Sequence, residues 1–392
     1  MSNYLITLTP TGRFFFGGDM TFMVNGKETE YTSYIIESNK FPQQTSLFGM
    51  LRFLILRNSG ESIFKDGKII DKNKEAAIGL IGSHSFSENT GHAANLTYEI
   101  NAGFKCSSHS FSENTGHAAN NFGKIKSLSP CYLQKECDGH WFDLYTAPAD
   151  YGMNVNFENV TSATLNETVV QIPQMDYCAK EYREQVYICA GCSEIKESEI
   201  FQKDVRNGIN RDVETGLVED SALFKQVFYR LKKGYRFAFE ADVEDLSESA
   251  ENCKRITKYN GQLVQIGADS SMFVIGIEEK TDEKKVESTN GTRLVLSSPA
   301  FIEAKDMKLA RFAITRTIPF KCIQTNVDTE SYNRISRKES ENEQYSNKYN
   351  LYDTGSVFYF KNDEDCRNFA EVLEQKKEFR QIGYNHYRII NN

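Results

Sequence analysis

The chain has 392 residues, a formal net charge of −8 at pH 7 and nine cysteines. This length is too great for one core and suits two domains with long inserted loops. A composition of 40% hydrophobic and 26% charged residues is ordinary for a globular protein and excludes wholesale disorder. Because the chain is acidic, any nucleic-acid site must be a local concentration of basic residues.

The sequence also limits where the protein works. Its apolar runs fall short of the ~20 residues needed to cross a bilayer, and residues 1–10 lack a signal-like pattern. An odd number of cysteines in a long chain favours reduced thiols over a disulfide framework. We therefore expect a cytoplasmic protein that does not enter a membrane.

The N-terminal region predicts a strand and then a helix. Residues 4–8 alternate like a strand. After Pro42, the hydroxyl of Thr45 or Ser46 is expected to cap a helix, because it can accept the unpaired amide hydrogens of the first turn. The helix is expected to end near 58–60, and its apolar positions are Leu47, Met50, Leu51, Leu54 and Ile55.

A duplicated segment follows this helix. Residues 83–95 recur without a change at 108–120. Two copies are too few for a solenoid, which needs at least three stacked repeats. The repeated unit is polar and has no apolar stripe, so we interpret it as a loop.

The middle of the chain mixes several signals. Residues 220–231 predict a helix with an apolar face, and 234–243 alternate like a half-buried strand. Residues 264–277 predict two short strands around a turn. The charged run 278–287 has little to bury and is expected to be a linker or an exposed hairpin tip.

The C-terminal region predicts a compact unit. It contains strand patterns at 293–297, 312–322, 356–360 and 382–390, and a helix capped by Asn362. If 299–309 also form a helix, the order is βαββαβ, the ferredoxin-like arrangement, which RNA-recognition modules share.

The N-terminal strand and helix would then belong to a second, heavily inserted copy. The predicted fold class is therefore α+β, with two fused ferredoxin-like, RRM-like domains and long inserted loops. We place the domains at 1–285 and 286–392.

Signatures of catalysis are weak. The sequence has no phosphate-binding loop, no HExxH pattern and no GxSxG elbow. His386, near Tyr384, is the suggestive acid–base candidate, but a single histidine on a strand is more often structural. One CxxC motif is weak support for zinc, with conceivable ligands Cys137, His140, Cys178, Cys189 and Cys192. We expect no catalytic residue, no metal and no cofactor.

Basic residues concentrate in two places. Between 203 and 236, eight cations and five acids leave a local net charge of +3. The cations are Lys203, Arg206, Arg211, Lys225, Arg230, Lys232, Lys233 and Arg236. A second group lies between 305 and 321. Such patches can bind phosphates by releasing condensed counterions, although a solvated or interface surface is the alternative.

Two kinds of turn add to this signal. Glycines at 354–356 and 382–385 open strands, where backbone amides can donate to anions. Residues 206–211 are interpreted as a flexible turn in which two arginines flank Gly208 and Ile209. We place the main RNA contact there, with Ile209 against a splayed base.

A family resemblance emerges from these segments in their order along the chain. The helix start at 41–52 resembles that of CRISPR-associated RAMP proteins. Further segments resemble one branch of these proteins, the third subunit of the type III-B (Cmr) effector complex. They are 147–150, 206–210, 264–271, 296–299 and 355–360. The duplicated segment and the acidic run depart from the pattern, and the glycine-rich C-terminal loop is reduced to Gly383.

The resemblance implies a non-catalytic subunit that binds the repeat-derived 5′ tag of the CRISPR RNA (crRNA). Its implied neighbours are the large polymerase/HD-type subunit, the first backbone RAMP subunit and other Cmr subunits, and it is not expected to form a homo-oligomer. The predicted RNA-binding residues are Arg13, Thr45, Ser46, Gly49, Arg52, Arg206, Asn207, Gly208, Ile209, Arg211, Ser270, Gly355, Ser356, Gly383 and Tyr384.

Three alternatives remain open. The chain could be the equivalent subunit of a type III-A or related complex. It could be a RAMP endoribonuclease that processes precursor crRNA, or a structural bridge that touches no RNA.

Overall fold

The computed structural model describes residues 2–18, 20–24, 31–65, 68–82, 122–165, 168–176, 184–189, 194–211, 215, 218–244, 256–280, 290–320 and 349–390. The chain divides into two units. Unit 1 comprises Met1–Trp141, Ile200–Asp282 and Phe320–Tyr349, and unit 2 comprises Phe142–Glu199, Glu283–Pro319 and Asn350–Asn392. The domain limits 1–285 and 286–392 stay a prediction. The duplicated segments, 83–95 and 108–120, lie outside the described residues.

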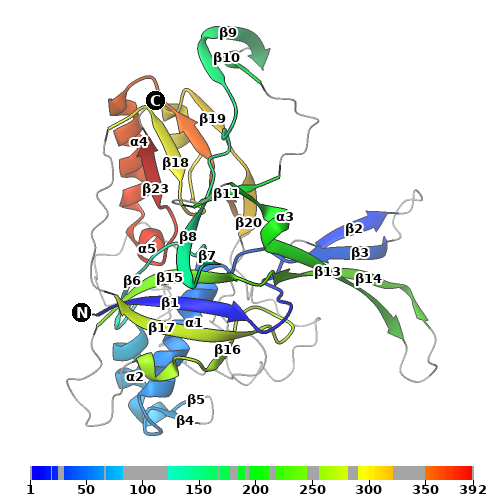
Figure 1. Cartoon of the computed structure of the whole chain (residues 1–392), viewed down its shortest axis with the longest axis vertical. Coiled ribbons are helices and arrows are strands. Elements are labelled where there is room, and N and C mark those ends of the chain that lie inside the picture. The colour runs from blue at the N-terminus through cyan, green and yellow to red at the C-terminus, as the bar shows by residue number, and fades with distance from the viewer. Residues whose placement is uncertain are drawn as a thin grey trace. The chain divides into compact units, whose positions relative to one another are not determined.

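Unit 1 is built mainly of strands (Figure 1). Its strands are β1 (Ser2–Pro10), β2 (Met20–Val24), β3 (Tyr31–Glu37), β4 (Phe64–Lys65), β5 (Lys68–Ile69), β6 (Ile125–Leu128), β7 (Tyr132–Cys137), β13 (Phe201–Arg211), β14 (Val218–Leu231), β15 (Tyr235–Val243), β16 (Leu263–Gln265) and β17 (Met272–Lys280). Its helices are α1 (Gln44–Asn58), η1 (Asp71–Asn73), α2 (Lys74–Ile81) and η2 (Ile256–Tyr259).

The main sheet of unit 1 has the ferredoxin-like strand order. β15 pairs antiparallel with both β1 and β7, and β17 pairs antiparallel with β1. The order is therefore β17-β1-β15-β7, with β1 and β7 parallel on either side of β15. Because α1 lies between β1 and β7 in the chain, these elements form the split βαβ unit of that fold. β16 and β6 extend the sheet.

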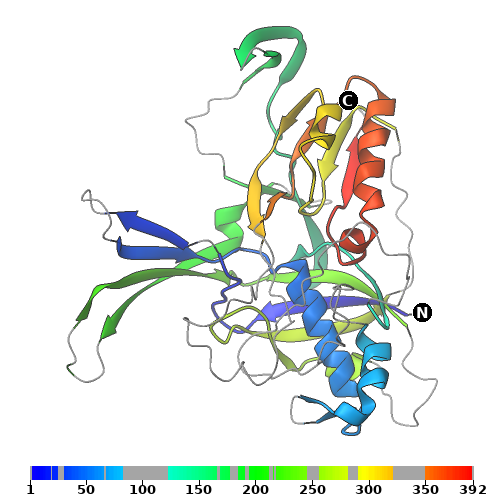
Figure 2. The ribbon, with the colours of Figure 1, turned by 180° about the vertical axis from the view of Figure 1, so that it is seen from behind.

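Alternation along these strands places the core on one face of the sheet. On β1, Tyr4, Ile6 and Leu8 are all at most 3% exposed, as expected when one face of a sheet is covered. The buried positions of α1 include the five that the sequence predicted, and the helix ends at Asn58 as expected. Figure 2 shows α1 lying across this sheet on the side opposite to that seen in Figure 1.

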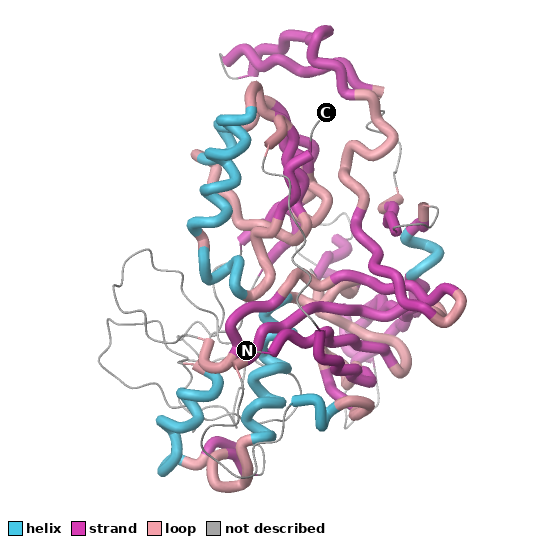
Figure 3. Tube along the Cα trace, turned by 60° about the vertical axis from the view of Figure 1, so that its left-hand side comes forward, coloured by secondary structure: helices cyan, strands magenta, loops and turns pink. Residues whose placement is uncertain are grey.

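Unit 2 is also strand-rich (Figure 3). Its strands are β8 (His140–Thr146), β9 (Val155–Leu165), β10 (Thr168–Met175), β11 (Val186–Cys189), β12 (Ile195–Lys196), β18 (Arg293–Leu296), β19 (Phe312–Ile314), β20 (Thr317–Phe320), β21 (Tyr349–Tyr352), β22 (Val357–Tyr359) and β23 (Tyr387–Ile390). Its helices are α3 (Glu197–Ile200), η3 (Asp306–Leu309), α4 (Asp363–Gln375) and α5 (Lys377–Gln381).

The sheet of unit 2 repeats the same order. β22 pairs antiparallel with β18 and β19, and β23 pairs antiparallel with β18, so the order is β23-β18-β22-β19. Asn362 caps α4 as predicted, because its side chain accepts a hydrogen bond from the Asp365 amide at 2.8 Å. The predicted α+β fold with two ferredoxin-like domains is therefore confirmed.

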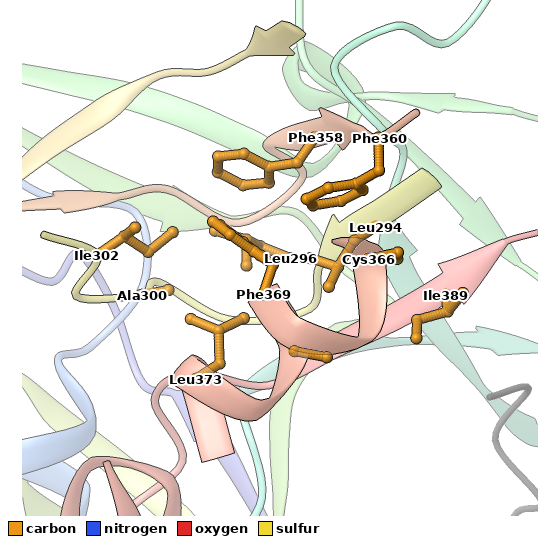
Figure 4. Close-up of a cluster of buried hydrophobic side chains, with 11 residues drawn as sticks. Leu294, Leu296, Ala300, Ile302, Phe358, Phe360, Cys366, Phe369, Leu373 and Ile389 are labelled. Atoms are coloured by element: carbon orange, nitrogen blue, oxygen red, sulfur yellow. The ribbon is translucent and has the colours of Figure 1, made fainter. Parts of the chain in front are cut away.

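The core of unit 2 forms between this sheet and α4. Phe369 of α4 packs against Phe358 of β22, with ring centroids 4.9 Å apart. Figure 4 shows the cluster, in which Leu294 and Leu296 of β18 lie beside Phe369 and Leu373. Burying an apolar side chain of this size contributes roughly 2–3 kcal/mol, so this cluster fixes α4 on the sheet.

Several local predictions were wrong. Residues 220–231 form most of strand β14 rather than a helix, because pairing with β13 and β3 outweighs the local apolar spacing. In 299–309, only Asp306–Leu309 is helical, as a 3-10 turn. β17 continues to Lys280 and so includes the start of the charged run expected to be a linker.

A buried ion pair ties the segment before β9 to the sheet of unit 2. Asp150 is 6% exposed and accepts hydrogen bonds from the guanidinium of Arg293 and the hydroxyl of Tyr359. Burial and the bond to Asp150 raise the pKa of Tyr359, so its hydroxyl stays protonated and donates. The Ala149 amide adds a bond to the Gly355 carbonyl at 2.8 Å.

We predict that Asp150→Ala destabilises the protein by about 3–5 kcal/mol, because it leaves the partly buried Arg293 charge without its carboxylate. Chemical denaturation of the full chain measures the change. Glu371→Ala, at an exposed position of α4, is the control and should change stability by less than about 0.5 kcal/mol. Equal effects of the two substitutions would contradict the assigned role.

Candidate nucleic-acid interface

A second sheet of unit 1 carries the stretch 206–211, which was predicted as the main RNA contact. Its order is β13-β14-β3-β2, and β14 pairs antiparallel with β13 but parallel with β3. We call this sheet the arm; its strands lie side by side apart from the main sheet in both Figure 1 and Figure 2. Because side chains alternate along each strand, the arm presents two different faces.

The interpretation of 206–211 as a flexible turn was wrong. Arg206 to Arg211 belong to β13, where Gly208 lies opposite Phe224. A Cβ on Gly208 would sit 2.0 Å from Cζ of Phe224, so glycine makes room for the ring and does not create a bend. Alternation puts Arg206 and Ile209 on opposite faces. The ladder shifts between Ile209 and Arg211, and the side chain of Arg211 lies outside the description.

One face of the arm brings two predicted arginines together. The guanidinium carbons of Arg13 and Arg206 lie 4.6 and 6.0 Å from the centroid of the Phe228 ring. Phe228 is 3% exposed, whereas Arg206 is exposed and Arg13 is half-buried. The ring attracts both cations through its quadrupole, which orients two guanidinium groups from distant parts of the chain.

An aromatic pair lies on the same face of the arm. The rings of Tyr34 on β3 and Phe224 on β14 stack with centroids 5.5 Å apart and an interplanar angle of 9°. We call Arg13, Tyr34, Arg206, Phe224 and Phe228 the arginine face. Cations beside stacked rings are typical of proteins that bind single-stranded RNA, where bases stack and phosphates pair with guanidinium groups.

Tyr34 and Phe224 were not predicted from the sequence as RNA contacts. Phe224 was assigned to the apolar stripe of a helix that does not form. Reading 220–231 as a strand would have put Phe224, Gln226 and Phe228 on one face and revealed the pattern.

The turn that contains Ser270 reaches this face. Asp269 and Ser270 both have positive φ, 52° and 55°. Gln226 is the cross-strand neighbour of Arg206. Its side-chain nitrogen, Nε2, donates to Oδ2 of Asp269 at 2.6 Å. Predicted residues Arg13, Arg206 and Ser270 thus come from three sequence regions to one part of the surface.

The predicted residues of α1 are less accessible. Thr45 is buried, and Ser46 and Gly49 are half-buried. Gln43 is the N-cap and makes no side-chain cap bond, so the predicted cap at Thr45 or Ser46 was wrong. Arg52 is 4% exposed and its guanidinium lies 4.1 Å from the Phe48 ring. Its side chain is therefore shielded from bulk solvent, and its contact with RNA stays a prediction.

The predicted residues of unit 2 are buried in turns. The amides of Gly355 and Gly383 donate to the carbonyls of Leu296 at 2.9 Å and Arg380 at 3.1 Å. The Ser356 hydroxyl donates to the Asp353 carbonyl, and Tyr384 is 2% exposed. These amides already have protein acceptors, and their contact with RNA stays a prediction.

His386 has the environment of a structural histidine. Its Nε2 lies 3.0 Å from the Arg380 carbonyl, and its backbone amide donates to the Ser298 hydroxyl. Burial lowers the pKa of His386 to about 4. The imidazole is therefore neutral near pH 7, and with a buried Tyr384 beside it in sequence it does not form the exposed acid–base pair that an endoribonuclease would need.

The possible metal ligands do not assemble among the residues that the structure describes. No group of three or more His, Cys, Asp or Glu side chains gathers there. Cys178 and Cys192 lie outside the described residues, as do the histidines of the duplicated segments. No helix in the described ranges is long and apolar enough to span a membrane.

Comparison with known families decides the assignment. Residues 174–392, more than half of the chain, match the family described as CRISPR-associated protein (Cas_Cmr3). The chain belongs to this family. The resemblance to the third subunit of the Cmr complex is therefore confirmed, and the chain is a Cmr3-type RAMP subunit of a type III CRISPR effector.

The chain is also similar, at low identity, to chains of solved structures. A chain of the type III-B Cmr-beta complex bound to cognate target RNA and AMPPnP is 13% identical, with 97% of this chain and 94% of that chain covered and a TM-score of 0.42. A chain of the same complex bound to cognate target RNA is 12% identical, with coverages of 99% and 96% and a TM-score of 0.43. A chain of the type III-A Csm3-Csm4 subcomplex is 11% identical, with coverages of 92% and 93% and a TM-score of 0.34. A comparison with curated proteins finds no match.

We predict that His386 makes the stability of this Cas_Cmr3 protein depend on pH. The folded-state pKa near 4 lies below the unfolded value of 6.5, so the unfolded state binds the extra proton between these values. The stabilisation is complete above pH 6.5 and falls by about 3 kcal/mol as the pH decreases to 4.

Chemical denaturation of wild type and His386→Gln between pH 7.5 and 4 gives the free energy of unfolding of each protein. The difference between the two pH dependences is the contribution of His386. Glutamine cannot titrate, so its stability should decrease less over the same range. Parallel curves for the two proteins would show that His386 is exposed and not buried.

Proposed function

We propose that this chain is a non-catalytic, RNA-binding subunit of a type III-B effector complex, where it binds the repeat-derived 5′ tag of the crRNA. The observation that supports this most directly is the arginine face, with two guanidinium groups oriented by Phe228 and the stacked Tyr34 and Phe224 beside them. Phosphates and unpaired bases are the ligands that such a surface suits.

The local charge of the arm agrees with this proposal. Two cations of the basic run have a carboxylate partner: Lys203 pairs with Glu37 at 2.9 Å and Arg230 pairs with Asp204 at 2.8 Å. Arg236 lies 3.9 Å from the Trp141 ring. Arg206 instead projects its guanidinium at an exposed position, where a phosphate can reach it.

We further propose that the subunit bridges the large polymerase/HD-type subunit and the first backbone subunit. The opposite face of β13 supports a protein contact, because Val205 and Ile209 are 48% and 51% exposed. Covering exposed apolar side chains with a partner protein removes them from water and stabilises the complex. An acidic exterior is tolerable if much of it faces protein subunits.

The endoribonuclease alternative makes a different prediction for the isolated protein. Incubation with repeat RNA in the absence of metal would give cleavage by a processing enzyme, but only binding by the proposed subunit. Ultraviolet crosslinking within a reconstituted complex tests the structural-bridge alternative. If the subunit touches no RNA, no crosslink should form between the crRNA and the arm. Reconstitution with type III-B or type III-A partner subunits tests the subtype.

We predict that the double variant Arg13→Ala, Arg206→Ala lowers affinity for the crRNA tag at least about tenfold at low salt. The salt dependence of binding should also flatten, by roughly one unit of slope per lost phosphate contact. Fluorescence anisotropy with a labelled tag RNA at several salt concentrations measures both quantities.

The matched control is Arg57→Ala, Arg367→Ala. It removes the same charge, and Arg57 likewise lies over an aromatic ring, 5.7 Å from the centroid of that of Tyr259. Equal losses in the two double variants would reduce the effect to net charge and remove the arginine face from the proposal.

A further inference from the structure

An exposed carboxylate lies next to the arginine face. Asp269 accepts a hydrogen bond from Gln226 at 2.6 Å, and Gln226 is the direct cross-strand partner of Arg206. Ala268, its neighbour in sequence, forms a β-bridge with Phe15, two residues after Arg13. A negative charge here opposes the binding of phosphate by both arginines, so a surface that served phosphates alone would be better without it.

The turn that carries Asp269 is rigidly bonded. The Ser271 amide donates to the Ala268 carbonyl at 3.2 Å, and the Ser271 hydroxyl donates to the same carbonyl at 2.6 Å while accepting from the Phe15 amide at 2.9 Å. Asp269 and Ser270 have left-handed φ values, which glycine would adopt at lower cost. The turn therefore fixes the direction of the Asp269 side chain relative to the arm.

A fixed carboxylate is a pure acceptor with room for several donors. Its two oxygens offer about four lone-pair sites, and the Gln226 amide uses one of them. An RNA presents a 2′-hydroxyl donor on every nucleotide, and its unpaired bases add the ring N–H of uracil and guanine and the exocyclic amino groups of cytosine, adenine and guanine. A carboxylate accepts from the cytosine amino group in direct readout, whereas the uracil N–H lies between two carbonyl oxygens that repel a carboxylate. Uracil has no amino group.

From this geometry we infer that Asp269 is a specificity-determining residue, which accepts a hydrogen bond from the exocyclic amine of an unpaired cytosine, adenine or guanine while the arginine face binds the adjoining phosphates. The inference rests on the proposed RNA-binding function. The inference explains why a carboxylate lies beside two guanidinium groups. The Asp269 carboxylate lowers the affinity for RNA in general and restores that affinity for a base that donates a hydrogen bond to it.

The test uses the full chain and two pairs of eight-nucleotide RNAs that differ in the amino group. One pair is oligocytidylate and oligouridylate; the other is oligoadenylate and its purine-riboside counterpart, which lacks only that amine. Wild type should bind the amino-bearing member about 5- to 50-fold more tightly, as expected for one direct base contact. The preference should shrink several-fold in Asp269→Asn, whose neutral oxygen is a weaker acceptor.

Asp269→Gly should abolish the preference, because glycine suits the positive φ but has no acceptor. Asp204→Asn is the matched control. Asp204 pairs with Arg230 on the same arm, so this variant loses the same charge and should bind every RNA more tightly while keeping the wild-type preference.

A preference that is absent from wild type, or equal in wild type and Asp269→Gly, would overturn the inference while leaving RNA binding intact. Failure of wild type to bind any of the four RNAs would instead overturn the proposed function, and this inference with it.

Discussion

The pairing of Phe14 with Tyr229 is the contact on which the arrangement of the arm depends. The two residues exchange backbone hydrogen bonds of 2.8 and 3.1 Å, which join the segment after β1 to the base of β14. The Phe14 ring is fully buried against Phe16 and Phe237. Because neighbouring side chains point to opposite sides of an extended chain, burying Phe14 directs Arg13 toward Phe228.

The sequence predicted those elements that local interactions determine. The helix α1 and the Asn362 cap of α4 follow from spacing and from a side chain that accepts nearby amide hydrogens. β14 was misassigned because its apolar residues fit a helix as well as a strand, and the deciding bonds come from β13 and β3. Arg13, Arg206 and Ser270 were predicted separately as RNA contacts, and their proximity, like the positions of Tyr34 and Asp269, depends on the long-range register.

Individual ion pairs decide how much positive charge the basic run of this acidic chain exposes. Along the basic run, Lys203 and Arg230 each have a carboxylate partner, so the eight cations in the sequence overstate the number of free positive charges that a ligand would meet. Exposed pairs of this kind contribute little to stability. Their effect is instead to neutralise part of the basic run, while Arg13 and Arg206 lie over the Phe228 ring.

The motifs of unit 2 have a structural explanation that does not involve RNA. Gly355 has a φ of 86°, and a Cβ there would approach the Ala147 carbonyl to 2.9 Å. Gly355 therefore allows the 147–150 segment to approach the sheet, where Asp150 reaches Tyr359 and Arg293. The two stretches that looked like separate family motifs, 147–150 and 355–360, are the two sides of one contact. Since glycine and aspartate both take part in that contact, folding alone accounts for their place in the family pattern.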